Sequence, residues 1–155
     1  MAFKKMRKTG LAIIIGLISL LCFGQKYDTE KLDSIFIHSE MPSESKLMFL
    51  ENCENAKIIA EQDIKNQEII ILIVGGIAPT IYTTDNDFEK KYQITYTDYG
   101  DLAAKDECML NYNFKIFDYL KEKYGKSWKR EIRKDVYGLK EWKKKKTPHN
   151  RQYSP

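Results

Sequence analysis

The chain has 155 residues, with 26 Lys and Arg against 22 Asp and Glu, and only two histidines, His38 and His149. This scarcity argues against zinc sites and nucleophilic sites that are built on histidine. Four of the basic residues lie within the first eight positions, so the rest of the chain is neutral overall. Net charge therefore gives no reason to expect a nucleic-acid partner.

The N-terminus has the pattern of an export signal. A basic cluster at residues 4–8 precedes an uncharged apolar run over residues 11–23 and then Gly24. The run falls in the range of about 7–15 residues that is typical of secretory signals, and it is shorter than the roughly 20 residues of a spanning helix. We predict a signal peptide over residues 1–24, a mature chain that begins at Gln25, and a periplasmic or secreted location without a transmembrane helix after processing.

Lipid attachment at Cys22 is the alternative way to process this signal. Bacterial lipoprotein signals end in a Leu-x-x-Cys pattern, and the apolar run here ends close to Cys22. Leu21, however, occupies the position where Gly or Ala is expected. Either route carries the domain out of the cytoplasm.

Charge is separated along the mature sequence. Residues 25–120 hold 9 basic and 18 acidic groups, whereas residues 121–155 hold 13 basic and 4 acidic groups. This pattern indicates either a basic tail that contacts an anionic surface or a basic helix that docks on the acidic half of its own domain. The neutral total favours docking within the domain, and the lysine run at residues 143–146 leaves contact with an anionic envelope surface as a hypothesis.

Two cysteines remain after processing, Cys53 and Cys108. In an oxidising compartment they would form one disulfide, which stabilises the fold by about 4 kcal/mol on the chain-entropy model. Cys53 also falls on the same helical face as Ala56 and Ala60, which is typical of a buried free thiol. Both interpretations are open from the sequence.

The first half of the mature chain predicts one long helix and one buried strand. Residues 25–43 are polar and predict a poorly specified lead-in that holds at most a short helix or edge strand. Apolar residues recur at helical spacing over residues 44–66. The continuous β-branched run over residues 69–74 predicts a strand that is buried on both faces.

The segment after this strand predicts a compact crossover. Thr84 or Asp85 provides a helix cap before a brief helix over residues 88–92. The β-branched and aromatic residues of 93–98 then predict a second strand, parallel to the first.

Helices and a tail complete the predicted domain. Apolar residues form a wide arc over residues 109–124, and a further helix runs from Ser127 to Gly138 with Trp128 facing inward. Its basic residues are expected to be solvated: Lys129, Arg130, Arg133 and Lys134. The prediction is an α/β or α+β domain over residues 44–146, with a small, mostly parallel sheet flanked by helices, followed by a disordered tail over residues 147–155.

Candidate ligand groups gather where the two strands are predicted to end. Gly75 and Gly76 follow the first strand, and they read as turn glycines in preference to a phosphate loop because no nucleotide-binding spacing is present. Since parallel strands end at one edge, the carboxylates after the second strand would lie nearby. They are weak candidates for a hard cation, and a solvated acidic loop is the favoured alternative: Asp98, Asp101, Asp106 and Glu107.

Several motifs in this order resemble those of the bacterial exported FEKKY domain-containing proteins, over about residues 69–146. The motifs are Gly75-Gly76-Ile77-Ala78-Pro79, Phe88-Glu89-Lys90-Lys91-Tyr92, Tyr124-Gly125-Lys126-Ser127-Trp128 and Arg133-Lys134-Asp135. The resemblance implies export and a shared domain, and it implies no substrate, cofactor or catalytic residue. Phe88 and Tyr92 are one helical turn apart, so we expect both to face the core, with the charged residues between them pointing outward.

These features favour a non-catalytic periplasmic or secreted module that binds an envelope protein, an extracellular protein or an anionic surface. No cofactor is predicted. Two alternatives remain open at this point: a metal-dependent hydrolase that uses the carboxylates at the sheet edge, and an envelope lipoprotein with a basic surface-binding tail.

Overall fold

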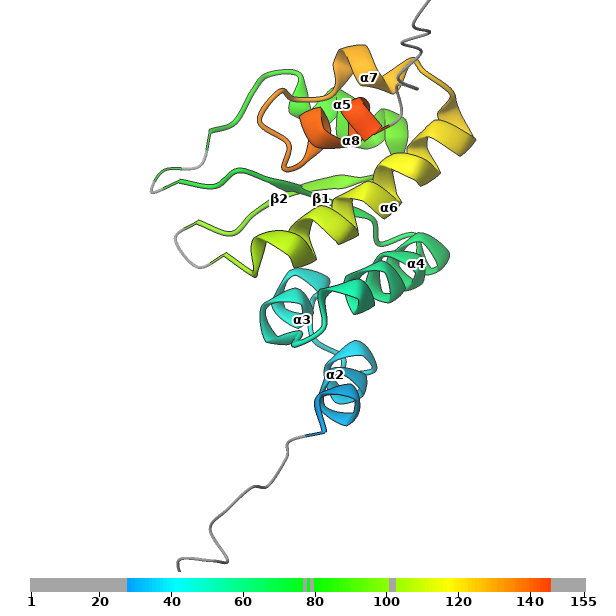
Figure 1. Ribbon diagram of the computed structural model, residues 1–155. Helices are drawn as coiled ribbons and strands as arrows, with labels where there is room; N and C mark the ends of the chain where they lie inside the picture. The colour runs from blue at the N-terminus through cyan, green and yellow to red at the C-terminus, as the bar shows by residue number, and fades with distance from the viewer. Residues whose placement is uncertain (1–27, 77, 79, 101–102, 146–155) are drawn as a thin grey trace, which may run out of the picture.

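The computed structural model describes residues 28–76, 78, 80–100 and 103–145. The predicted signal peptide, Cys22, Asp101 and the predicted tail lie outside these residues. Short helices precede a two-stranded sheet, and further helices follow it (Figure 1). In chain order the elements are α2 (Thr29–Ile37), α3 (Ser43–Phe49), η1 (Cys53–Asn55), α4 (Ala56–Asn66), β1 (Ile70–Ile73), α5 (Asp85–Tyr92), β2 (Thr95–Asp98), α6 (Asp106–Tyr124), α7 (Trp128–Glu131) and α8 (Leu139–Lys145).

The sheet confirms the predicted parallel pair. β1 and β2 run in the same direction, with Ile70 opposite Thr95 and Ile73 opposite Asp98. In Figure 1, α4 lies below the sheet and α5, α7 and α8 lie above it, while α6 crosses in front of the strands and also contacts α7 and α8. The fold is therefore a single α/β arrangement in which helices flank a small parallel sheet.

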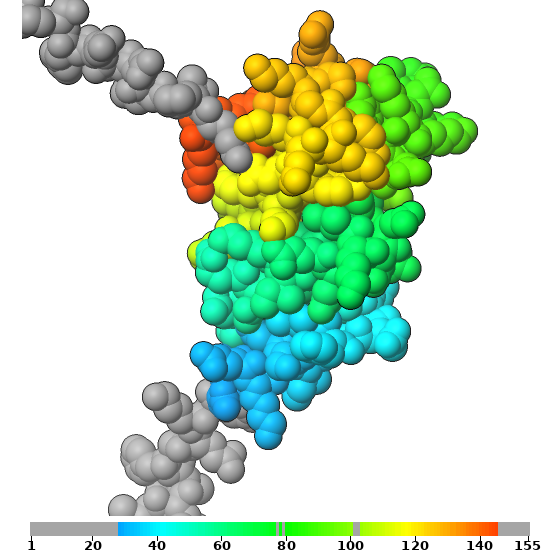
Figure 2. All heavy atoms as spheres, turned by 90° about the vertical axis from the view of Figure 1, so that its right-hand side faces the viewer, coloured from blue at the N-terminus to red at the C-terminus, as the bar shows by residue number. Residues whose placement is uncertain are grey.

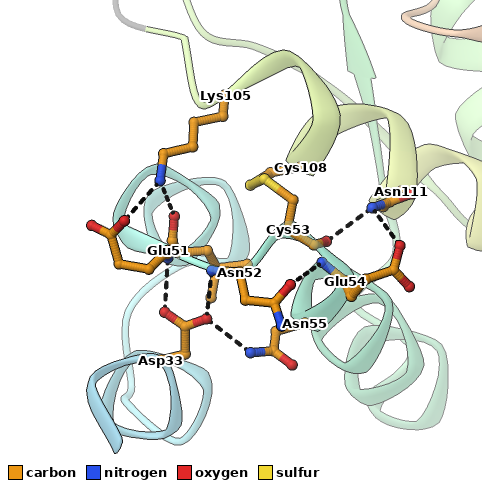
Figure 3. Close-up of a disulfide and its surroundings, with 10 residues drawn as sticks. Asp33, Glu51, Asn52, Cys53, Glu54, Asn55, Lys105, Cys108 and Asn111 are labelled. Atoms are coloured by element: carbon orange, nitrogen blue, oxygen red, sulfur yellow. Dashed lines mark hydrogen bonds and ion pairs between the residues drawn. A yellow bond between two sulfur atoms is a disulfide. The ribbon is translucent and has the colours of Figure 1, made fainter. Parts of the chain in front are cut away.

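The prediction of one continuous helix over residues 44–66 is wrong. Leu50 is extended and fully buried, and it separates α3 from the short helix η1. The fully buried carboxylate of Asp33 stabilises this break by accepting the backbone N–H groups of Glu51 (2.8 Å) and Asn52 (2.9 Å), as Figure 3 shows. Buried backbone donors need such partners, so an acid on α2 allows the chain to leave the helix here.

The predicted lead-in contains the short helix that its sequence allowed, and Asp33 joins this helix to the rest of the domain. The nine residues of α2 lie within residues 25–43, and Asp33 on this helix accepts a third hydrogen bond from the side chain of Asn55 (2.8 Å). The helix is capped by Asp28, whose carboxylate accepts the N–H of Lys31. This region is thus an ordered part of the domain.

A disulfide joins Cys53 of η1 to Cys108 of α6, with 4.3 Å between the Cα atoms (Figure 3). The disulfide interpretation is therefore confirmed, and the free-thiol interpretation is wrong. Two hydrogen bonds flank the link: Lys105 Nζ donates to the carbonyl of Leu50 (2.9 Å), and Asn111 Nδ2 donates to that of Cys53 (3.1 Å). The break before η1 is what brings Cys53 to the start of α6.

The helix predicted from Ser127 to Gly138 is also too long. α7 ends at Glu131, and Ile132 is extended. The chain then runs beside β1, where Val136 forms an antiparallel bridge with Ile73. Backbone hydrogen bonds from Val74 N to Asp135 O (2.9 Å) and from Tyr137 N to Leu72 O (3.0 Å) replace those of a helix. Pairing with the edge of β1 that does not face β2 thus overrides the local helical pattern.

The core extends from one end of the molecule to the other. Trp128 and Trp142 are almost fully buried and pack on Phe117 of α6, with ring centroids 5.8 and 5.6 Å from that ring. Figure 2 shows α2 and α3 at one end, α4 and α6 in the middle and α7 at the other end. Within the described residues, no helix combines the length and the apolarity needed to cross a membrane.

Candidate functional site

Gly75 and Asp98 come together at the carboxyl edge of the sheet. A Cβ atom on Gly75 would lie 2.1 Å from Asp98 Oδ1 and 2.9 Å from the backbone nitrogen of Gly100, so only glycine fits without displacing backbone. Asp98 Oδ1 accepts the N–H of Gly100 (2.7 Å). By contrast, a Cβ on Gly76 would meet nothing within 4 Å. Gly75 is therefore needed for the close approach of the two strand ends.

The described candidate carboxylates belong to two different elements. Asp98 binds the turn after β2, whereas Asp106 and Glu107 form the exposed first turn of α6. Acidic residues in this position complement the positive end of the helix dipole. Among the described residues, which do not include Asp101, no group of three His, Cys, Asp or Glu side chains is arranged to hold a metal ion. Metal binding at this edge stays a prediction.

A network of hydrogen bonds and ring contacts centres on Arg133. Its Nη1 donates to Asp85 Oδ2 (2.9 Å), and its Nε (3.0 Å) and Nη2 (2.6 Å) donate to the two oxygens of Asp135. The guanidinium lies 4.6 Å from the ring centroid of Tyr82 and 5.5 Å from that of Tyr96. Only 6% of the Arg133 side chain is exposed. The prediction that Arg133 is solvated is wrong.

Hydrogen bonding stabilises the charged forms of Arg133 and Asp135. The hydrogen bonds between Arg133 and Asp135 raise the pKa of the guanidinium and hold the pKa of the Asp135 carboxyl below its usual value. Asp85 Oδ2 also accepts the backbone N–H of Tyr82 (2.9 Å), which ties the loop between β1 and α5 to the start of α5. Three nitrogens of Arg133 donate to carboxylates, so the guanidinium is held in one position and supports the end of the loop next to α5.

Next to the Arg133 cluster, the loop exposes apolar side chains. Val74 is 58% exposed, Ile81 is 85% exposed and Tyr82 is 48% exposed. The loop projects from the carboxyl edge of the sheet before it returns to α5 (Figure 1). Exposed apolar groups on a loop whose base is fixed are typical of a surface that contacts another molecule.

The Phe88–Tyr92 motif contributes to the fold and to the outer edge of β2. Phe88 and Tyr92 are 4% and 1% exposed, so the prediction that both face the core is confirmed. Glu89 points toward β2, where its Oε1 accepts the backbone N–H of Tyr96 (2.8 Å). Lys91 pairs with Glu131 (2.8 Å), whereas Lys90 is exposed.

Sequence reasoning missed a second buried polar cluster, around Asp63. Its two oxygens accept hydrogen bonds from Ser43 Oγ (2.7 Å) and Tyr112 Oη (2.5 Å), which ties α3, α4 and α6 together. Burial raises the pKa of the Asp63 carboxyl and that of the Tyr112 hydroxyl. The cluster borders a polar hollow of about 560 Å³. Asp63 lies on the same face of α4 as the buried residues Ile59 and Ala60, and this spacing in the sequence could have predicted that Asp63 is buried.

The comparisons with known proteins add no family to these observations. No protein-family model matches the chain, and neither the search of curated proteins nor that of solved structures finds a match. The resemblance to FEKKY domain-containing proteins therefore stays a prediction.

Proposed function

We propose that the protein is exported and acts in the periplasm or outside the cell as a non-catalytic binding module. The observation that carries this proposal is the loop between β1 and α5. It exposes Val74, Ile81 and Tyr82 beside the Arg133 cluster, in which the guanidinium and Asp85 are buried and Asp135 is partly exposed. The signal-like N-terminus and the disulfide support the location outside the cytoplasm.

Exposed apolar side chains beside the Arg133 cluster suit binding for two physical reasons. Aromatic and aliphatic side chains contribute most of the binding free energy in protein interfaces when they enter a pocket on the partner. A side chain that is already held in place loses less conformational entropy on association. Asp85 holds the Tyr82 end of this loop, because its carboxylate accepts both the guanidinium of Arg133 and the backbone N–H of Tyr82.

Site-specific photo-crosslinking in native cells tests the proposal. A photoreactive amino acid replaces Ile81, and the matched control carries it at the exposed position Glu122 on α6. We expect a discrete adduct at position 81 alone, identified by mass spectrometry of the cell envelope. Identical adducts at both positions, or only random abundant proteins, would count against a binding loop.

The same preparation tests export and processing. We expect the mass of the mature chain to correspond to a start at Gln25, in a periplasmic or secreted fraction. A mass that corresponds to a start at a lipid-modified Cys22, together with recovery in the membrane fraction, would indicate the lipoprotein alternative. Recovery of the unprocessed chain in the cytoplasm would contradict export.

A further inference from the structure

The outer edge of β2 is a second surface, separate from the apolar loop. In a parallel ladder, alternate residues direct both backbone groups toward the neighbouring strand. Thr95 faces β1, because its N–H donates to Ile69 O (2.9 Å). Tyr96 and Asp98 therefore direct their N–H and C=O groups away from β1. Within the described residues the sheet contains two strands, and none pairs with this edge.

Among the described residues, a side chain covers part of this edge. Glu89 Oε1 accepts the N–H of Tyr96, and Glu89 is half-buried. Natural proteins protect exposed strand edges with charged side chains, because an unpaired edge can pair with another chain. A glutamate can rotate aside when a strand approaches, whereas a neighbouring strand is part of the fold. Glu89 therefore covers the edge of β2, and it can move away when another strand approaches.

An acidic hollow lies beside the same strand. It measures about 600 Å³, and Ile70, Thr95 and Thr97 are among the residues that line it. The carboxylates of Glu44, Glu68 and Glu89 also line it, and none of its described lining residues is lysine, arginine or histidine. Tyr99 Oη donates to the carbonyl of Glu44 (2.8 Å), which holds the start of α3 close to the end of β2.

We infer that the outer edge of β2 and this hollow form a docking site for an extended, basic segment of a partner protein. An added strand would pair with the backbone groups of Tyr96 and Asp98, which gives affinity without sequence preference. Lysine or arginine side chains on alternate positions would lie over the hollow, with their aliphatic stems on Ile70 and their charges near the glutamates. This inference rests on the proposed binding function and adds the class of partner.

The described part of the chain does not supply such a segment to a second copy of itself. The basic residues of the C-terminal half are concentrated on α6, α7 and α8 and in the turns beside them. A helical segment cannot add to a sheet as a strand, because its backbone groups are already bonded within the helix. The charge complementarity of the hollow therefore points to another protein.

Fluorescence anisotropy with designed peptides tests this site on the processed full chain. The probe is a labelled octapeptide of alternating lysine and valine. Two matched peptides carry glutamate in place of lysine, or N-methyl groups on the backbone of alternate residues. We expect the lysine peptide to bind at low salt, and both controls to bind at least tenfold more weakly, because one loses charge complementarity and the other loses strand pairing.

Variants distinguish the charges that line the hollow from the net charge of the protein. We expect the double variant Glu44→Gln, Glu68→Gln to weaken binding of the lysine peptide by about fivefold, in line with two exposed ion pairs. The matched control is Glu30→Gln, Glu122→Gln, which removes the same charge from exposed positions outside the hollow and should leave affinity unchanged. Equal weakening by both variants would overturn the site, because it would show attraction to net charge alone.

Other outcomes would also overturn the inference. Equal binding of the N-methylated peptide would exclude strand pairing. Tighter peptide binding by the variant Lys146→Gln, Arg151→Gln would assign the site to the chain's own C-terminal residues, and a dimer that dissociates on Glu44→Gln, Glu68→Gln would assign it to a second copy. Failure of peptide binding with a specific adduct at position 81 would remove this inference alone, whereas the reverse result would remove the loop as the binding surface.

Discussion

The two edges of the small sheet are closed in different ways. On the outer side of β1, Asn113 of α6 accepts the N–H of Leu72 (3.0 Å) and donates to the carbonyls of Leu72 and Tyr137 (both 2.9 Å). Val136 adds the bridge to Ile73 on the same side. On the outer side of β2, the described residues close the edge with a side chain: Glu89 accepts the N–H of Tyr96. One edge is closed by buried structure, and the other is guarded by a charged group at the surface.

The two edges should therefore differ in what they contribute: the β1 edge to the stability of the fold, and the β2 edge to the access of a partner. Removing a partner from a buried backbone group leaves an uncompensated polar atom, whereas a backbone group near the surface can bond to water. Changes at the β1 edge should therefore lower the free energy of unfolding, and changes at the β2 edge should alter access with little effect on that free energy. The following predictions test this contrast from the largest expected effect to the smallest.

The disulfide should contribute the largest single effect, because it fixes the start of the helix that carries Asn113. We expect the variant Cys53→Ala, Cys108→Ala to lose about 4 kcal/mol of unfolding free energy, the chain-entropy value for a loop of this length. Urea denaturation measures the change, and the wild-type chain in reductant should match the variant. An unchanged midpoint after complete reduction would contradict the prediction.

Arg133 should come next, because it anchors the segment that returns to the β1 edge. We expect Arg133→Met to lose about 3 kcal/mol, since breaking a buried ion pair leaves the buried carboxylate of Asp85 without compensation. Asp85 depends strongly on this partner: its Oδ1 is already buried without a hydrogen bond among the described residues. The control is Arg130→Met at an exposed position, which urea denaturation should place within about 0.5 kcal/mol of wild type.

Asn113→Ala tests the closed edge itself. We expect a loss of about 2 kcal/mol in unfolding free energy, because backbone groups of Leu72 and Tyr137 lose a partner that is fully buried. The variant should also increase amide exchange at Leu72, which hydrogen-exchange NMR detects directly. Asn66→Ala, at an exposed position at the end of α4, is the matched control and should change neither quantity. Equal effects of the two variants would mean that Asn113 does not close the edge.

The sequence predicted the elements whose pattern agrees with their packing. The β-branched run of β1 and the apolar arc of α6 bury most of the expected side chains, but the predicted burial of Val74 is wrong, because the strand ends at Ile73 and Val74 is 58% exposed. The continuous helix over residues 44–66 and the long helix after Ser127 failed, because partners far along the chain decide those regions. Asp33 stabilises one break, and the edge of β1 draws in the other.

The buried polar residues were predictable in part. Asp33 lies four residues before the buried Ile37, Asp63 lies four residues after Ile59, and Asn113 lies four residues before Phe117. A polar residue in register with a buried helical face signals a buried hydrogen-bond partner. The sequence does not say which partner it is, because those partners are 18 to 49 residues away along the chain. The acidic hollow beside β2 was missed for the same reason: residues on α3, α5 and β2 meet only in the fold.

The smallest change tests the guarded edge. We expect Glu89→Ala to accelerate amide exchange at Tyr96 by about tenfold, because the N–H loses its acceptor, while the free energy of unfolding falls by less than about 1 kcal/mol. Thr95 provides an internal control, since its amide donates to Ile69 O within the sheet and should exchange as in wild type. Glu89→Gln keeps an acceptor oxygen and should restore protection at Tyr96. If Thr95 and Tyr96 accelerated equally, Glu89 would be stabilising the whole sheet, and the distinction between a structural edge and an accessible edge would not hold.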